Sequence, residues 1–432
     1  MTHQTPFQIR TFGCRLNIYE SEVIKREAEV SGLDQLPGGV IIFNTCAVTG
    51  EAVRQAKQAI RKAARENPEA RIIVSGCAAQ TEPETFSDME EVALVLGNQE
   101  KLIAHSYRQL PDFGVNDFEK VRVNDIMAIQ EMASHMIESI ENRTRAFVQV
   151  QNGCNHRCTF CIIPYGRGNS RSVPAGDIVD QVQRLCDNGY SEIVLTGVDI
   201  TAWGIDLPGS PRLGRLVQLL LTRVRGLSRL RLSSIDSIEV DEPFLDAIGD
   251  DKRLMPHLHL SLQSGDDMIL KRMKRRHVRD DILRFCDGVR SMRPDVVFGA
   301  DIIAGFPTET EAMFQNSLSI IHEAGLSFVH VFPFSLRKGT PASRMPQVNQ
   351  KTIKERASLL RMYGKKMLMC LLESRTGKKE YVLIERNNLG RTPQFIPVQV
   401  NNLNHGMVVR MMITGNDGKR LIGQLDSNNK AV

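Results

Sequence analysis

The sequence predicts an α/β protein with three parts: an open parallel α/β domain at the N-terminus, a partial barrel of six βα units in the centre, and a small antiparallel β-barrel at the C-terminus. Short β-rich runs alternate with helical patterns over most of the 432 residues, as in parallel α/β folds. Cysteine-bearing and polar motifs follow these runs, where strand ends share one edge of a sheet. Near the C-terminus only short strands and turn residues remain, which indicates a small barrel.

Length and composition allow two or three domains, because 42% of the residues are apolar and 24% are charged. We expect domains at 1–125, 145–368 and 369–432, with a linker at 126–144. No run of about 18 apolar residues and no signal-peptide pattern is present, so we expect a cytoplasmic location and no membrane partner. The net charge of +5 permits a nucleic-acid partner without requiring one.

The N-terminal part contains three predicted strands that are each followed by a cysteine and then by a helical pattern. The strands are 8–11, 40–43 and 71–74, and the cysteines are Cys14, Cys46 and Cys77. Because the carboxyl ends of parallel strands meet at one edge, the three thiols can converge and hold a metal cluster. The alternative is that they are small buried residues that fill space.

Three further cysteines, Cys154, Cys158 and Cys161, lie within eight residues of one another in a single loop. A zinc site usually needs four protein ligands in two pairs, and no second pair follows. Three thiolates suit a four-iron cluster with one open iron, which can bind a small molecule through its amino and carboxylate groups and pass it an electron. This pattern predicts S-adenosylmethionine and radical chemistry.

The central part contains six predicted strands with helices between them, at 147–151, 192–196, 230–233, 257–262, 296–303 and 328–333. Polar motifs follow the strand ends, which is the face where barrel enzymes carry out their chemistry. The last part has predicted strands at 380–384, 395–400, 407–414 and 420–425. From Cys370 onward it has nine Lys and Arg against five Asp and Glu, so it is the part best suited to bind RNA.

With these motifs, nearly the whole chain resembles the radical S-adenosylmethionine methylthiotransferases, which end in a β-barrel of the TRAM type. The segments Thr-Phe-Gly-Cys-Arg-Leu-Asn-Ile-Tyr-Glu at 11–20 and Asn-Thr-Cys-Ala-Val-Thr at 44–49 are most similar to the branch that acts on N6-threonylcarbamoyladenosine beside the tRNA anticodon. The isopentenyladenosine branch more often has Gln-Met-Asn after the first cysteine, and the ribosomal-protein branch tends to Gly-Cys-x-Lys-Asn.

The resemblance implies two [4Fe-4S] clusters: one on Cys154, Cys158 and Cys161 that cleaves S-adenosylmethionine, and an auxiliary one on the N-terminal cysteines. It also implies a set of residues around S-adenosylmethionine. These are Phe160, Thr196, Gly197, Asp199, Ser234, Gln263, Ile303, Gly305 and Phe306. One departure is Phe334, where the family pattern leads us to expect tyrosine.

The implied reaction is methylthiolation of C2 of N6-threonylcarbamoyladenosine at position 37, by a 5′-deoxyadenosyl radical and sulfur from the auxiliary cluster. The implied partners are the anticodon stem-loop of tRNA, a sulfur donor and a low-potential electron donor such as flavodoxin or ferredoxin. Alternatives are methylthiolation of isopentenyladenosine or of a ribosomal-protein aspartate, and a non-catalytic iron-sulfur protein that binds RNA.

Three patterns carry weaker predictions. The basic run at 271–279 could bind the anticodon stem, one of its bases could bind the methionine carboxylate, or the run could be the solvated start of a helix. His257 and His259 alternate on a predicted strand, and we expect packing rather than metal binding. Cys186, Cys286 and Cys370 lie in helical stretches, and we expect them in the core.

Overall fold

The computed structural model describes residues 7–108, 120–129 and 144–426, and the chain forms two compact units. Unit 1 comprises Met1–Ile137, Gln151–Arg171 and Ser335–Ser343. Unit 2 comprises Glu138–Val150, Ser172–Phe334 and Arg344–Val432. The loop with the second cysteine set therefore belongs to the same unit as the N-terminal domain.

Unit 1 is built on a five-stranded parallel sheet in sequential strand order. Its strands are β1 (Gln8–Thr11), β2 (Val40–Thr45), β3 (Arg71–Gly76), β4 (Leu94–Leu96) and β5 (Val121–Arg122). The helices are α1 (Arg15–Val30), α2 (Gly50–Glu66), α3 (Cys77–Thr81), α4 (Pro83–Ser87) and α5 (His105–Arg108). This confirms the open parallel domain predicted from the sequence.

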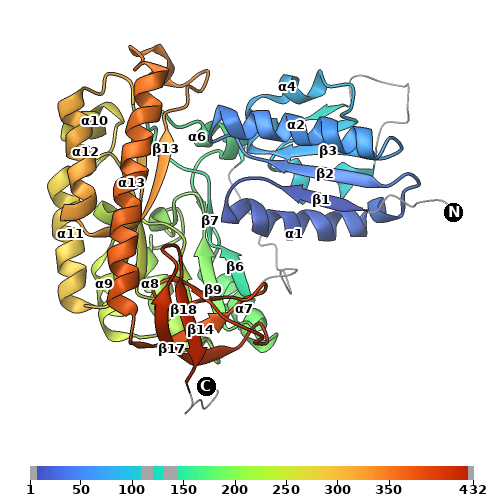
Figure 1. Ribbon diagram of the computed structural model, residues 1–432. Helices are drawn as coiled ribbons and strands as arrows, with labels where there is room; N and C mark the ends of the chain where they lie inside the picture. The colour runs from blue at the N-terminus through green and yellow to red at the C-terminus, as the bar shows by residue number, and fades with distance from the viewer. Residues whose placement is uncertain (1–6, 109–119, 130–143, 427–432) are drawn as a thin grey trace. The chain divides into compact units, whose positions relative to one another are not determined.

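The two long helices of this domain cover opposite faces of its sheet (Figure 1). One core joins α2 to Phe43 and Val74, and the other joins α1 to Ile42 and Ile73, because side chains alternate along each strand. Helix α2 begins where the Thr49 hydroxyl accepts a hydrogen bond from the Ala52 N–H at 3.1 Å.

The second stretch of unit 1 contains the short strand β7 (Gln151–Asn152), the helix α6 (Ile163–Arg167) and the start of β8 (Arg171–Ser172). Gly153 stands at the entry to the cysteine loop with φ of 73°, and a Cβ there would lie 1.9 Å from the Asn169 carbonyl oxygen. Only glycine fits this turn without moving the backbone.

Unit 2 contains six parallel strands in two groups of three, β10-β9-β6 and β11-β12-β13. Isolated bridges between Leu230 and Leu254 and between Ile235 and Leu260 connect the groups, so the strands follow one another as in a partial barrel. The strands are β6 (Arg145–Gln149), β9 (Glu192–Thr196), β10 (Leu230–Leu232), β11 (His257–Gln263), β12 (Val297–Ala304) and β13 (Leu326–Pro333). The six predicted strands are confirmed, with ends that differ by at most two residues.

Helices separate these strands, and the long helix α13 packs against β13 (Figure 1). The helices of unit 2 are α7 (Ala175–Asp187), α8 (Leu213–Arg223), α9 (Glu242–Asp250), α10 (Asp267–Arg272), α11 (Arg279–Met292), α12 (Glu311–Glu323) and α13 (Gln350–Arg375). None of the helices in the described ranges has the length and apolar composition that a membrane span needs.

The C-terminal part of unit 2 is a closed five-stranded barrel, but it is mixed rather than antiparallel. Its strands are β14 (Lys379–Ile384), β15 (Leu389–Arg391), β16 (Pro397–Gln399), β17 (Val408–Asn416) and β18 (Leu421–Leu425). β16 pairs with β18 in parallel, so the antiparallel prediction is wrong for this pair. The two strands are not neighbours in sequence, and β17 lies between them along the chain, which allows a parallel pairing that no local turn signal reveals.

The prediction of a buried Cys370 is also wrong, because this thiol is exposed on α13, while Cys286 is buried as expected and Cys186 is half-buried. Helix α13 buries the face that carries Ile353, Leu360 and Leu372, and Cys370 lies outside that face. The predicted domain boundaries remain predictions, and most of the predicted linker at 126–144 falls outside the described residues.

Candidate functional site

The three N-terminal cysteines lie at the carboxyl ends of three neighbouring strands of unit 1. Cys14 precedes α1 after β1, Cys46 follows β2, and Cys77 begins α3 after β3. A Cβ on Gly13 would lie 2.8 Å from Cys46 Cβ, which brings the first two strand ends together. Because β1, β2 and β3 are adjacent and parallel, the sheet gathers all three thiols at one edge.

A buried arginine from the other stretch of unit 1 joins this edge. The Arg167 Nε donates a hydrogen bond to Cys77 Sγ at 3.1 Å, and its two terminal nitrogens reach both Glu20 carboxylate oxygens at 2.5 and 2.9 Å. Lys101 Nζ donates to the same carboxylate at 2.7 Å. Glu20 and Lys101 are fully buried and Arg167 is 2% exposed, so these charges depend on one another for compensation.

Burial and neighbouring charges shift the pKa values of Glu20 and Cys46. Burial alone raises the pKa of Glu20, but Arg167 and Lys101 outweigh it and lower the pKa to about 2. Burial, together with the charge of the neighbouring Cys77 and Cys14, raises the pKa of the Cys46 thiol to about 12. A Cys46 thiolate is thus unfavourable at this position without a bound cation.

The donor set fits an iron-sulfur cluster. Cys77 Sγ receives hydrogen bonds from Arg167 Nε and, at 3.7 Å, from Asn98 Nδ2, as the sulfur of an anionic ligand requires. Cys14 and Cys46 complete a set of three soft ligands, which suits iron-sulfur clusters or zinc.

The second cysteine set lies in the loop after β7, and the structure shows how that loop is held. The Cys154 N–H donates to the Gly168 carbonyl oxygen and the Cys161 N–H to the Cys158 carbonyl oxygen, both at 3.0 Å. The Arg157 guanidinium donates to the Cys154 carbonyl oxygen at 2.7 Å. All three thiols are partly exposed, as ligands of an open cluster must be.

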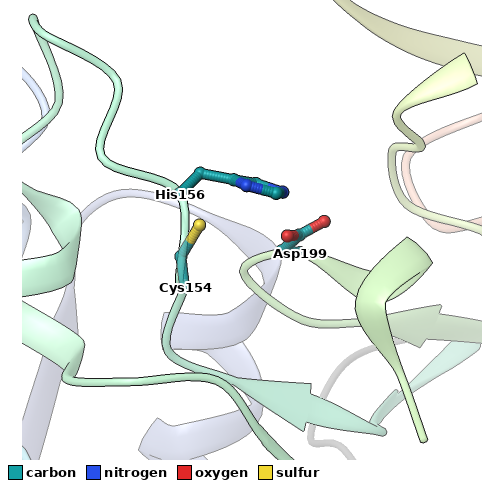
Figure 2. A group of neighbouring side chains, drawn as sticks. All are labelled: Cys154, His156 and Asp199. Atoms are coloured by element: carbon teal, nitrogen blue, oxygen red, sulfur yellow. The ribbon is translucent and has the colours of Figure 1, made fainter. Parts of the chain in front are cut away.

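His156 is a neighbour of Cys154 that the sequence did not single out. Figure 2 shows the side chains of Cys154 and His156 projecting from this loop. The Cys154 sulfur and a ring nitrogen of His156 lie within 4.8 Å of each other. Phe160 lies in the same loop and is half-buried.

The other predicted cofactor residues belong to unit 2, where they follow the carboxyl ends of four neighbouring strands. Thr196 ends β9, and Gly197 and Asp199 follow it. Ser234 follows β10, Gln263 ends β11, and Ile303, Gly305 and Phe306 lie at or after the end of β12. The parallel strands place these residues along one edge, which is the arrangement that the sequence predicted.

Two of these strand ends show backbone conformations that are unusual for their position. Gln263 has φ of 71°, which a non-glycine residue seldom adopts, and a change of register in the β11–β12 pairing accompanies it. Gly305 has φ of 72°, and a Cβ there would lie 2.5 Å from Ile353 Cγ1. Its N–H donates to Glu309 Oε2 at 3.0 Å.

Phe306 is fully buried, and its ring packs edge to face against Phe334 with ring centroids 5.7 Å apart. Phe334 itself is 7% exposed. A phenyl ring at this buried position needs no hydrogen-bond partner, so the departure from tyrosine leaves the packing complete.

The basic run at 271–279 is largely occupied by contacts inside unit 2. Arg275 donates to Asp236 at 2.7 Å, and Arg276 forms an ion pair with Glu239. Arg279 donates to the carbonyl oxygens of Gly265 and Asn316 at 2.8 and 2.6 Å. Arg275, Arg276 and Arg279 therefore hold segments of unit 2 together, which counts against the binding of tRNA phosphates by these three side chains.

Two family models match successive parts of the chain. Residues 148–321 match the radical SAM superfamily, and residues 6–97 match the uncharacterized protein family UPF0004. The chain is 53% identical over 409 residues to the threonylcarbamoyladenosine tRNA methylthiotransferase MtaB of Rickettsia prowazekii, covering 94% of each chain. The chain belongs to the radical SAM methylthiotransferase family. S-adenosylmethionine and a [4Fe-4S] cluster are therefore its cofactors.

Other methylthiotransferases of the family are more distant. MtaB of Aquifex aeolicus is 34% identical, covering 93% of this chain and 98% of that protein. A tRNA-2-methylthio-N(6)-dimethylallyladenosine synthase of Mycobacteroides abscessus is 33% identical, covering 96% of this chain and 81% of that protein. Among solved structures, the radical S-adenosylmethionine methyltransferase TsrM from Kitasatospora setae shares the fold, with a TM-score of 0.55 and 14% identity over 78% of this chain and 76% of that one.

Proposed function

We propose that this methylthiotransferase transfers a methylthio group to C2 of N6-threonylcarbamoyladenosine at position 37 of tRNA, giving 2-methylthio-N6-threonylcarbamoyladenosine. The observation that carries the proposal is the 53% identity, over 94% of both chains, to a threonylcarbamoyladenosine tRNA methylthiotransferase. The relative named for dimethylallyladenosine reaches 33%, so the comparison favours the threonylcarbamoyl substrate.

The proposal gives each cysteine set its own cluster. Cys154, Cys158 and Cys161 would hold the [4Fe-4S] cluster that binds S-adenosylmethionine, and Cys14, Cys46 and Cys77 would hold an auxiliary [4Fe-4S] cluster. When bound, these groups supply the electron, the carbon radical and the sulfur that the inert C2–H bond of adenine requires.

The protein's own side chains would position these groups. Arg167 and Asn98 donate to Cys77 and orient its sulfur. The Glu20 carboxylate, which also accepts a hydrogen bond from Lys101, holds the Arg167 guanidinium in place. At the strand ends of unit 2, the residues proposed to bind S-adenosylmethionine are Thr196, Gly197, Asp199, Ser234, Gln263, Ile303, Gly305 and Phe306. Phe160, in the cysteine loop, is a further residue proposed to bind this cofactor. Such positioning lowers the entropy that the reaction has to lose.

The proposed partners follow from this chemistry. The substrate would be the anticodon stem-loop of tRNA, and the C-terminal barrel, of TRAM type, would contribute positive charge to its binding. A sulfur donor and a low-potential electron donor such as flavodoxin or ferredoxin complete the reaction. A tRNA substrate places the enzyme in the cytoplasm.

The decisive experiment measures modified adenosines in tRNA from cells with and without the gene, by digestion and mass spectrometry. The proposal predicts that the methylthio group disappears from threonylcarbamoyladenosine alone and returns when the wild-type gene is restored. Restoration with the Cys154→Ala or the Cys77→Ala gene should leave threonylcarbamoyladenosine without its methylthio group. Loss of the group from isopentenyladenosine instead would assign the other substrate.

A second measurement separates catalysis from RNA binding alone. The reconstituted, reduced protein should release 5′-deoxyadenosine from S-adenosylmethionine, and Cys154→Ala should abolish this release. Unchanged nucleosides in the deletion strain, together with no 5′-deoxyadenosine, would support the non-catalytic alternative.

A further inference from the structure

Three polar side chains on neighbouring strands of unit 2 lie together without a role in the proposed function. They are His259 on β11, Asp301 on β12 and His330 on β13. Asp301 pairs directly with His330, and His259 pairs with Gly299, two residues before Asp301. Because side chains alternate along a strand, these pairings put all three on the same face of the sheet.

That face is opposite to the one covered by α13. Val329, the neighbour of His330, touches Gly364 of α13, where a Cβ would lie 3.0 Å from Val329 Cβ. His330 therefore points away from the helix. Its side chain is 60% exposed, Asp301 is 27% exposed and His259 is 8% exposed, so the group is anchored at one side and open at the other.

The distances bring three potential ligand atoms together. His259 Nε2 lies 2.8 Å from Asp301 Oδ1, and His330 Nδ1 lies 3.3 Å from the same oxygen. All three ligand atoms lie within 4.8 Å of one another. Two imidazole nitrogens and one carboxylate form a ligand set that divalent first-row transition metals bind.

The surroundings of these three side chains suit a cation-binding site better than simple packing. A Cβ on Gly299 would lie 2.6 Å from His259 Nδ1, so glycine leaves room for the imidazole beside the carboxylate. A carboxylate between two imidazoles offers negative charge and nitrogen ligands to a cation, whereas an anionic ligand would be repelled by the carboxylate.

We propose that His259, Asp301 and His330 form a binding site for a divalent first-row transition metal such as Zn²⁺. Three protein ligands leave at least one coordination position, on the exposed side of His330, for water or another oxygen donor. The site uses no cysteine and is independent of the proposed function. It also revises the expectation that the strand histidines serve packing alone.

The test is zinc binding to the full chain with its iron-sulfur clusters reconstituted under anaerobic conditions, so that the cluster thiols are occupied. After equilibrium dialysis, elemental analysis should find one zinc per chain. His330→Ala and Asp301→Asn should each weaken zinc binding at least about tenfold. The matched control His322→Ala, an exposed histidine on α12, should bind zinc as the wild type does.

A second preparation excludes zinc held by thiols: the full chain with Cys14, Cys46, Cys77, Cys154, Cys158 and Cys161 replaced by serine should keep its one zinc. His330 is exposed, so His330→Ala should fold normally, which circular dichroism checks. Equal zinc in wild type and His330→Ala, or no zinc in the wild type, would overturn the proposal and leave a hydrogen-bonded triad.

Discussion

Arg167 connects a proposed cluster ligand to a buried carboxylate, so its removal should affect folding as well as activity. In Arg167→Ala, Glu20 retains only Lys101 as a buried cationic partner, and we expect the apoprotein to lose about 3–5 kcal/mol of unfolding free energy. Urea unfolding measures this loss. Arg54→Ala removes an exposed pair with Glu51 and should change the midpoint little. Equal midpoints for both variants would contradict the network.

Glu20 should also make stability depend on pH. Its pKa is lowered to about 2 from an ordinary value of 4.5, so the folded state binds the proton less well than the unfolded state. The stabilisation is present above about pH 4.5 and is lost as the pH falls toward 2, with a magnitude on the order of 3 kcal/mol. Urea midpoints measured across this range should fall more steeply for the wild type than for Glu20→Gln, and parallel curves would refute the assignment.

At the level of single residues, the sequence indicated the candidate cluster ligands better than the side chains that contact them. The cysteines of both sets could be found because thiols at strand ends or in tight spacing are rare. Arg167 could not, since it contacts Cys77 across 90 residues of chain and nothing local marks it. Asn17 and Glu20 lie three and six residues after Cys14, so their spacing in a helix could have indicated that these polar side chains lie near the cysteine.

Among the elements, the turn from β3 into α3 positions Cys77 and depends on one glycine. Gly76 has φ of 98°, and a Cβ there would lie 2.4 Å from both the nitrogen and the carbonyl oxygen of Thr45. Gly76→Ala should displace the strand end, so that iron bound after anaerobic reconstitution falls to roughly half, because one of the two proposed clusters would be lost.

The matched control for this prediction is Gly176→Ala in the first turn of α7, where a Cβ meets nothing within 4 Å. It should keep the iron content of the wild type. Full iron in Gly76→Ala would show that the auxiliary site tolerates a shifted turn, and would count against the placement of Cys77 as a ligand.

Elements with strong local signals were predictable, and elements defined by distant pairing were not. The strands β1, β9 and β11 are near the predicted positions because β-rich runs and flanking turns mark them. β5 and β15 have only two and three residues, too few to show a period. The register of β11, β12 and β13, which brings His259 to Asp301, depends on pairing that no single strand encodes.

On the scale of the whole molecule, an aromatic residue joins the C-terminal barrel to the six-stranded core of unit 2. The Phe395 ring, between β15 and β16, is contacted by the guanidinium groups of Arg145, Arg231 and Arg391, with Cζ atoms 4.8, 4.9 and 4.5 Å from the ring centroid. Two of these arginines belong to core strands, so the ring fixes the barrel to the core.

Phe395→Ala should therefore destabilise the barrel and its attachment together, by about 2–4 kcal/mol. Thermal unfolding followed by circular dichroism measures the effect, and tRNA affinity should fall with it if the barrel contributes to binding. Tyr363→Ala, on an exposed part of α13, is the matched control and should behave as the wild type. An unchanged melting temperature in Phe395→Ala would show that the barrel is held by other contacts.

Unit 1 is assembled from three separate stretches of chain, and this order has a consequence for its synthesis. Glu20 leaves the ribosome long before Arg167, its counter-ion 147 residues downstream. At about 5–20 residues per second, translation needs about 7 to 30 s to add that stretch. Lys101, 81 residues downstream of Glu20, emerges sooner, so for part of this time the nascent N-terminal domain has only one of the two cationic partners of the carboxylate. The domain is therefore a candidate client for chaperones until the arginine emerges.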